Sequence, residues 1–321
     1  MMIEPAEMEP GVAVRSVDGV VVPSPVAVVG RSPWRLAFER LRRDRAAMIA
    51  LGVIIFIVLV AIFAPLVATM TGHGVNQQFR DVPAGLTPDG LPVGPSHTFL
   101  LGTDSQGRDL LVRVAYGARI SLLVGIVATI LTVTVGAVLG LAAGFFGGVV
   151  DSIIARIVDV VLSIPYLLFA IALVSISHPS LTIVIIVIAM FGWAAVARVV
   201  RGQVLSIREK EYIEASRSLG ASSWRIMFID ILPNVAAQII VYATLLIPVS
   251  IVTEAALSFL GVGVPPPTAD WGQMIAQSQQ FYQQAWWYFV FPSLALLITT
   301  VAFNIFGDGV RDCLDSRVDR L

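Results

Sequence analysis

The chain is poor in charge, with one lysine and one cysteine. Asp, Glu, Lys and Arg make up 13% of its 321 residues, whereas 57% are apolar. An average soluble protein carries roughly 25% charged residues. This composition excludes a soluble single-core enzyme, a disordered chain, a coiled coil and collagen. A formal net charge of −1 gives no indication of a nucleic-acid partner. We therefore expect a polytopic membrane protein.

The two rarest residues exclude several kinds of chemistry. Cys313 has no second cysteine with which to form an intramolecular disulfide or a metal cluster. The only lysine, Lys210, has no glycine-rich stretch before it, so the chain lacks the G-x-x-x-x-G-K-[ST] phosphate loop. The three histidines have no metal-ligand spacing, and no G-x-S-x-G motif is present. We expect no catalytic residue, no metal and no bound cofactor, and any ATPase that drives this protein must be another polypeptide.

What the chain does have is long apolar runs, each able to cross a bilayer as a helix of about 20 residues. Six are found, at 46–68, 120–146, 153–176, 181–197, 235–260 and 285–306. Four contain no ionisable residue, whereas the third holds Arg156 and Asp159 and the fifth holds Glu254. The predicted fold class is an all-α polytopic membrane protein with six transmembrane helices.

The arginines predict the orientation. Fifteen basic residues lie within 31–45, between the fourth and fifth spans, or after the sixth, against four on the other side. Since basic residues concentrate in cytoplasmic loops, both termini are expected in the cytoplasm.

The parts between the spans follow from this topology. They are a disordered tail at 1–30, an amphipathic helix on the cytoplasmic membrane surface at 31–45, and the first transmembrane helix at 46–68. An outer loop at 69–119 and a five-helix core at 120–307 come next, and a cytoplasmic tail at 308–321 ends the chain. The core includes a cytoplasmic loop at 198–234 and an outer loop at 261–284. Segment 31–45 could equally be a simple positively charged anchor.

The cytoplasmic loop predicts two short helices joined by a glycine turn. Tyr212, Ala215, Ser216 and Leu219 recur at helical spacing. Gly220 suits a left-handed helix stop. Ser222 or Ser223 can cap the second helix, and Pro233 ends it or begins the next span. The result would be a rigid knob projecting into the cytoplasm.

The same loop resembles the EAA loop of ABC importer permeases. Glu214, Ala215, Gly220, Leu232 and Pro233 match its positions, whereas Ser216 replaces the second alanine and Asp230 stands where isoleucine is common. The resemblance implies that the loop docks into a groove of an ATPase subunit. An ordinary amphipathic connector is the alternative. The candidate coupling residues are Tyr212, Glu214, Ala215, Ser216, Leu219, Gly220, Trp224 and Pro233.

Other segments resemble the dipeptide, oligopeptide and nickel permeases, with the "C" subunit of dipeptide permeases the nearest form. They are residues 101–109, 116–125, 258–268, 270–272 and 303–312. The resemblance implies a type I ABC importer permease fold in the bacterial inner membrane. It also implies a homologous second permease, two ATPase subunits that bind ATP and Mg, and an extracytoplasmic solute-binding protein, all working in membrane lipid.

The substrate stays open between dipeptides, oligopeptides, nickel and haem. An ion-coupled secondary carrier is the rival of another class, and only Glu254 could serve it as an intramembrane ligand. A membrane hydrolase lacks any nucleophile and base pattern.

Several residues inside the spans are candidates for packing or transport. Gly136, Gly140 and Gly144 form a small-residue stripe for close helix packing. Arg156 and Asp159 are three residues apart and are expected to form a structural ion pair. Glu254 has no evident local partner, so we expect it in the translocation path or at the contact with a second subunit.

Overall fold

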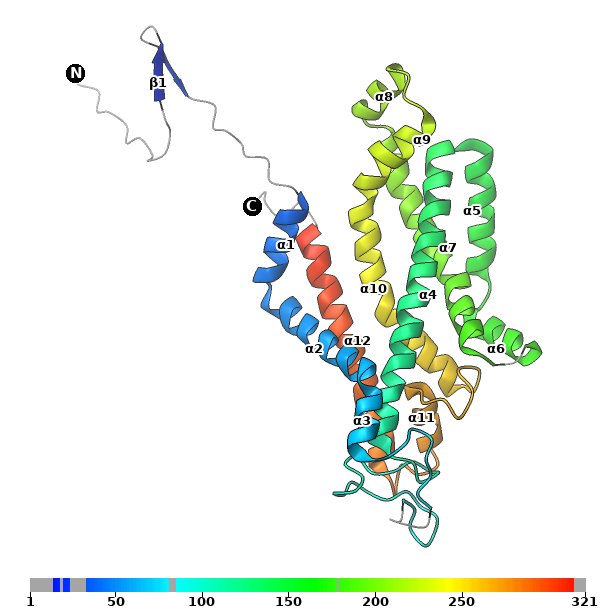
Figure 1. Cartoon of the computed structure of the whole chain (residues 1–321). Coiled ribbons are helices and arrows are strands. Elements are labelled where there is room, and N and C mark those ends of the chain that lie inside the picture. Colours follow the sequence, from blue (N-terminus) through cyan, green and yellow to red (C-terminus); the bar gives the residue numbers. More distant parts are fainter. Residues whose placement is uncertain (1–13, 18–19, 24–32, 81–84, 178, 315–321) are drawn as a thin grey trace, which may run out of the picture.

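The computed structural model describes residues 14–17, 20–23, 33–80, 85–177 and 179–314. Five helices in these residues are long and apolar enough to cross a membrane (Figure 1). They are α2 (Arg45–Ile62), α4 (Leu110–Phe146), α7 (Leu181–Arg208), α10 (Leu232–Phe259) and α12 (Trp286–Leu314). A bent pair, α5 (Gly148–Ser163) and α6 (Tyr166–Ile176), supplies a sixth span if counted as one. The predicted helical fold is confirmed.

The bend between α5 and α6 reaches 80° and has a local cause. Ile164 and Pro165 are both extended there, and Pro165 precedes the first residue of α6. Because proline disfavours helical geometry in the residue before it, α5 stops and the chain turns before a new helix starts.

The N-terminal part differs from the expectation of a disordered tail. Strands β1 (Val14–Val17) and β2 (Val20–Pro23) pair antiparallel, with Val14 opposite Pro23. Valine is the commonest residue in both strands, and its branched side chain favours extended backbone. The remainder of 1–30 lies outside the described residues.

A separate helix precedes the first span. α1 (Pro33–Arg43) ends just before Asp44, whose carboxylate accepts hydrogen bonds from the Ala46 and Ala47 amides and caps α2. α1 packs against α12, where a Cβ at Gly309 would lie 3.6 Å from Leu41 Cδ1. The chain therefore changes direction between α1 and α2 at Asp44, which caps the first span. α3 (Ala64–Thr71) continues that span towards the outer loop.

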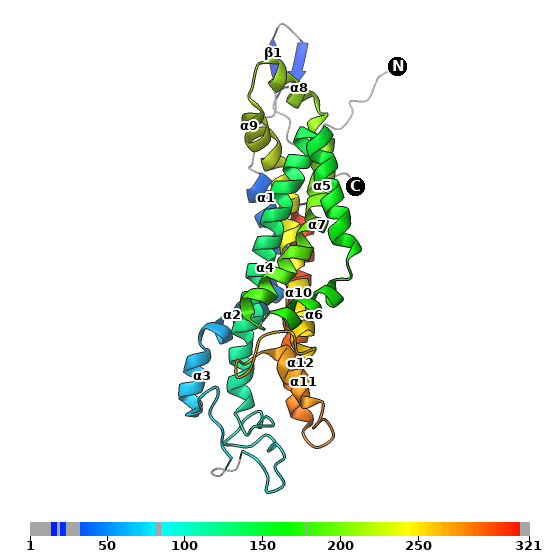
Figure 2. The same cartoon turned by 90° about the vertical axis from the view of Figure 1, so that its right-hand side faces the viewer.

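Helix α4 lies at the centre of the molecule. The views in Figures 1 and 2 place it against α7 along most of its length, and α10, α2 and α5 also contact it. The outer loops and α11 (Trp271–Ser278) gather around the N-terminal end of α4. The short helices α8 (Glu211–Ser218) and α9 (Ser223–Arg225) lie at the opposite end of the molecule.

The glycine stripe of α4 lies in its contact with α7. A Cβ at Gly136 would be 2.6 Å from Val196 Cβ, and one at Gly144 would be 2.7 Å from Val204 Cβ. At Gly140 the added atom would meet the Ala197 carbonyl oxygen at 2.6 Å. No room is left for a methyl group, because the two backbones approach directly.

This contact predicts that replacing glycine by alanine has different effects on stability at Gly140 and at Gly52. Gly140→Ala should destabilise the protein by about 1–3 kcal/mol, because the new methyl meets a backbone oxygen that cannot rotate away. Gly52→Ala, with nothing within 4 Å of the new methyl, should be neutral or stabilising by up to about 1 kcal/mol through helix propensity.

The measurement is the fraction of detergent-solubilised protein that stays folded after heating. Equal melting of the two variants would mean that α4 and α7 separate easily at Gly140.

Candidate functional site

The loop that is predicted to be cytoplasmic forms a compact knob, here defined as residues 209–231. α8 ends at Ser218, and Gly220 then adopts a left-handed φ of +78°. Its amide donates to the Arg217 carbonyl at 2.9 Å, and the next amide donates to the Ser216 carbonyl at 3.1 Å. These bonds close the C-terminus of α8 and turn the chain into α9.

The second half of the knob joins α10 without a break. Ser222 caps α9, its hydroxyl accepting from the Arg225 amide at 3.3 Å. A π-helical stretch, Ile226–Ile231, follows, and Pro233 lies in the first turn of α10. Proline has no amide to donate into the preceding π-helical turn, so it interrupts the regular hydrogen-bond ladder at this junction. The knob and the fifth span are nevertheless one continuous rod.

One isoleucine that sequence reasoning missed anchors the knob. Ile213 is fully buried and belongs to an apolar cluster with Phe145, Val204, Ile226 and Ile231. The signal available in the sequence was an isoleucine isolated between polar neighbours on a short helix. Its burial fixes which face of α8 points away from the protein.

The predicted stripe lies on the opposite, outward side. Tyr212, Ala215 and Leu219 are exposed and Ser216 is half-buried, with Leu219 88% exposed. Trp224 is 67% exposed and stacks on Phe228, with ring centroids 5.4 Å apart. Large apolar side chains on a surface of this kind are typical of a protein contact. Glu214 is exposed among them.

Two arginines, Arg208 at the end of α7 and Arg217 in the knob, contact the C-terminal end of α4. Arg208 Nη1 donates to the carbonyl oxygens of Gly144 and Phe145 at 3.2 and 3.1 Å. Arg217 lies over the Phe145 ring, 6.0 Å from its centroid. Because the last carbonyls of a helix lack partners within the helix, Arg208 both caps α4 and fixes the end of α7 beside it.

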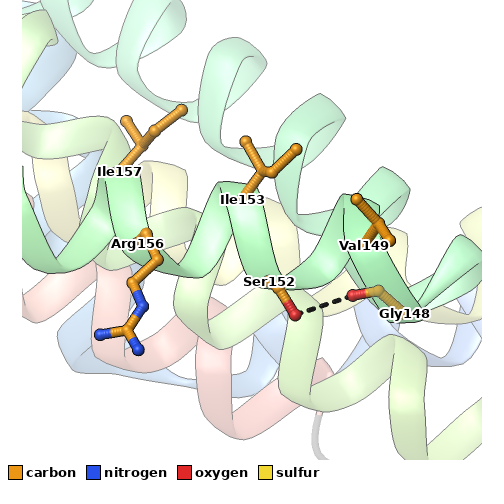
Figure 3. A pocket seen from close by; sticks show the side chains of 6 residues that line it. All are labelled: Gly148, Val149, Ser152, Ile153, Arg156 and Ile157. Carbon is orange, nitrogen blue, oxygen red and sulfur yellow. Dashed lines mark hydrogen bonds between the residues drawn. The ribbon is translucent and has the colours of Figure 1, made fainter.

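The expected ion pair between Arg156 and Asp159 is wrong. Asp159 pairs instead with Arg198 of α7, Oδ1 to Nη2 at 2.9 Å. Arg156 is exposed and lines a shallow hollow of α5 with Ile153 and Ile157 (Figure 3). Asp159 pairs with an arginine on the adjacent helix instead of with the arginine three residues before it. Spacing along the sequence does not reveal such a partner.

The expectation that Glu254 lacks a local partner is wrong. The side chain is fully buried inside the subunit, and it accepts hydrogen bonds from Ser121 at 3.1 Å and Ser258 at 2.9 Å. It therefore has partners within the subunit, and its role in the translocation path or at a second subunit stays a prediction. One partner comes from α4, more than a hundred residues away, and this is why the sequence did not show it.

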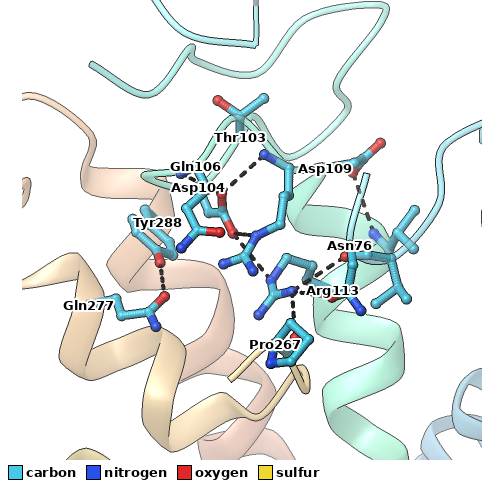
Figure 4. A network of polar contacts seen from close by, with 12 residues as sticks. Asn76, Thr103, Asp104, Gln106, Asp109, Arg113, Pro267, Gln277 and Tyr288 are labelled. Carbon is cyan, nitrogen blue, oxygen red and sulfur yellow. Dashed lines mark hydrogen bonds and ion pairs between the residues drawn. The ribbon is translucent and has the colours of Figure 1, made fainter. Parts of the chain in front are cut away.

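The outer end holds a buried ionic cluster that sequence reasoning missed (Figure 4). Asp104 Oδ2 lies 2.6 Å from Arg108 Nε and 3.2 Å from Arg113 Nε. Arg113 Nη1 also donates to the Val75 and Pro267 carbonyls at 3.3 and 3.4 Å. Arg113 thus joins the two outer loops to the first turns of α4. The segment that supplies Asp104 and Arg108 had been noted only for its family resemblance.

No group of three or more His, Cys, Asp or Glu side chains that could hold a metal ion occurs in the part of the chain that the structure describes.

Comparisons with known proteins agree with this geometry. Residues 136–320 match the family model "Binding-protein-dependent transport system inner membrane component". Residues 32–87 match the "N-terminal TM domain of oligopeptide transport permease C". The first match alone covers more than half of the chain.

Individual relatives extend over nearly the whole chain. It is 41% identical to the dipeptide transport system permease protein DppC of Alkalihalophilus pseudofirmus, covering 89% of this chain and 91% of that protein. It is 40% identical to the di/tripeptide transport system permease protein DppC of Pseudomonas aeruginosa, over 91% and 95% of the two chains. The oligopeptide permease OppC of Bacillus subtilis is 39% identical over 89% and 90%.

A solved structure shares the fold. A chain of the MetNI methionine ABC transporter, in an inward-facing conformation, superposes with a TM-score of 0.53 at 20% identity, covering 63% of this chain and 96% of that one. The family matches and the near full-length relatives establish that this chain belongs to the inner membrane components of binding-protein-dependent transport systems.

Proposed function

We propose that this chain is one of two permease subunits of an ABC importer that carries short peptides into the cell. The observation that supports the substrate class is about 40% identity, over about 90% of the chain, to permeases named for dipeptides and di/tripeptides. Oligopeptide and glutathione permeases are nearly as similar, at 39% and 38% identity. All four substrates are peptides or peptide-like. The comparisons therefore support peptides as the substrate class better than they support any one peptide length.

ATP hydrolysis in this proposal takes place on separate ATPase subunits with bound Mg. The absence of a phosphate loop from the sequence supports this division. A solute-binding protein delivers the peptide to the outer loops, and a homologous permease supplies the other half of the pathway.

The knob is the contact with the ATPase in this proposal. Tyr212, Leu219 and Trp224 present exposed apolar surface, and a cluster of exposed apolar side chains is typical of a protein contact. Ile213 and Arg208 hold the knob rigidly to α4 and α7. A movement of the ATPase would therefore reach the membrane helices rather than bend the loop.

Substrate class can be tested by transport. The complete transporter, reconstituted in proteoliposomes with its binding protein, should take up a labelled dipeptide only when ATP is supplied. Unlabelled dipeptides and tripeptides should compete, and nickel and haem should not. Nickel or haem uptake that peptides fail to inhibit would replace the peptide proposal.

Gly220 provides a test of the knob. Gly220→Val places a branched side chain at φ +78°, at a cost of roughly 1 kcal/mol or more, so α8 and α9 should change their relative angle. We expect normal membrane insertion and a severalfold loss of co-purifying ATPase subunits and of coupled transport.

The matched control is Gly202→Val, in α7. Both glycines have nothing within 4 Å of an added Cβ, and only Gly220 has positive φ. Wild-type coupling in Gly220→Val would identify the loop as an ordinary connector.

Cys313 tests the orientation. It lies in the last turn of α12 and is half-buried. With both termini in the cytoplasm, a membrane-impermeant thiol reagent added to intact cells should leave Cys313 unlabelled and should label it after permeabilisation. Labelling in intact cells would reverse the proposed topology.

A further inference from the structure

The junction between α1 and α2 carries three arginines without a partner in the subunit. Arg42 and Arg43 end α1, and Arg45 begins α2. All three residues are exposed. Among the residues that the structure describes, none of the three pairs with a carboxylate or donates a side-chain hydrogen bond. Their positive charges are therefore available to a group outside this chain.

The acidic side chains nearby do not cancel this charge. Asp44 Oδ1 accepts from two backbone amides at the start of α2, at 2.9 and 3.2 Å. Glu39 Oε1 pairs with Arg35 Nε at 3.3 Å, earlier in α1. Asp308 and Asp312 lie on α12, which packs against α1, and form no ion pair in the described part of the chain. With three arginines and one aspartate, the junction keeps a net charge of +2.

The first span sets the depth of this junction in the bilayer. α2 is an apolar helix of 18 residues that begins at Arg45. Because its apolar length fills the hydrocarbon layer, the junction lies at the level of the phospholipid headgroups, whichever leaflet faces this end of the molecule. Arginine side chains at the end of a span extend to that level. A guanidinium group there can bind a phosphate through two parallel hydrogen bonds.

Each of the two helices also places an exposed apolar side chain four residues from one of these arginines. Phe38, 62% exposed, precedes Arg42 in α1, and Ile49, 69% exposed, follows Arg45 in α2. Residues four apart lie on the same face of a helix. A positive charge beside an exposed apolar side chain matches a phospholipid, which offers a phosphate to the first and an acyl chain to the second.

The protein itself holds the junction in this position. α1 packs against α12, where a Cβ at Gly309 would lie 3.6 Å from Leu41 Cδ1, and the Asp44 cap fixes the start of α2. In both overall views the knob extends farther from the outer loops than α1 does (Figures 1 and 2). The bilayer surface, rather than a subunit seated on the knob, is therefore the occupant that this position favours.

We infer that residues 38–49 form a binding site for an anionic phospholipid, whose phosphate pairs with Arg42, Arg43 and Arg45 and whose acyl chains pack against Phe38 and Ile49. An anionic lipid is favoured over a zwitterionic one because the junction carries net positive charge. The inference goes beyond the proposed function, because it concerns the contact of this subunit with the membrane and holds for any transported solute.

Native mass spectrometry of the complete transporter tests the site. The two probes are phosphatidylglycerol, which is anionic, and phosphatidylcholine, which has no net charge. The wild-type transporter should retain more phosphatidylglycerol than the variant Arg42→Gln with Arg45→Gln, by severalfold, whereas retention of phosphatidylcholine should be equal. The matched control is Arg80→Gln with Arg156→Gln, which removes the same charge from two exposed arginines elsewhere in the chain. This control should bind both lipids as the wild type does.

Inorganic phosphate separates a lipid site from a site for any phosphate. Added in excess over phosphatidylglycerol, it should not displace the lipid, because it has no acyl chain to pack against Phe38 and Ile49. Displacement by inorganic phosphate would assign the three arginines to a free anion and overturn the lipid site. The glutamine substitutions leave Asp44 in place, so α2 keeps its cap.

Photo-crosslinking provides a measurement that removes no charge and does not depend on the glutamine variants. With the photoreactive benzoylphenylalanine in place of Phe38, irradiation of the transporter in membranes should join this chain to a phospholipid, detected as an increase in the mass of the chain. A crosslink to a second polypeptide instead, or equal retention of phosphatidylglycerol by the wild type and the Arg42 and Arg45 variant, would overturn the lipid site.

Discussion

The direct backbone contact between α4 and α7 is the constraint on which the rest of the molecule depends. In a bilayer, helices gain little from burying apolar surface, so close packing and interhelical polar contacts must hold them together. Gly136, Gly140 and Gly144 allow that packing along a seam of α4. At 37 residues, α4 is about 55 Å long. It therefore reaches from the buried outer cluster to the knob, and both ends of the protein are built against one rod.

Polar contacts close both ends of this rod. At the end that carries the knob, Arg208 caps the carbonyls of Gly144 and Phe145. At the opposite end, Arg113 joins the first turns of α4 to the loop before α4 and the loop before α11. Removing one member of a buried ion pair typically costs about 3–5 kcal/mol, because the remaining charge is left without a partner. The buried ion pairs thus fix these loops to α4. In the proposed importer, an ATPase that pulls on the knob would move a body whose outer surface is fixed to it.

The buried charges are concentrated at the outer end, and this distribution has a consequence for transport. An alternating-access protein must separate some of its contacts in every cycle, and contacts between ionisable groups can be separated at a cost that depends on pH. Glu254 and Asp270 lie where α11 meets α4 and α10. Trp271, which donates to a carbonyl of α4, and Gly272, which is packed against α10, form this interface.

The sequence by itself determined the class of protein, the apolar segments that form its long helices and the position of the knob. Hydrophobic runs, Pro165, Gly220 and Ser222 act through local backbone chemistry, which neighbours in the chain suffice to predict. It did not determine which side chains meet. Asp159 pairs with Arg198, and Glu254 with Ser121, across separations that hydropathy and spacing do not encode. Ile213 became an anchor only because Val204 and Ile231 converge on it. Tertiary structure decided these contacts, because a buried polar or apolar group takes the partner that packing brings to it, and the nearest residue in sequence need not be that partner.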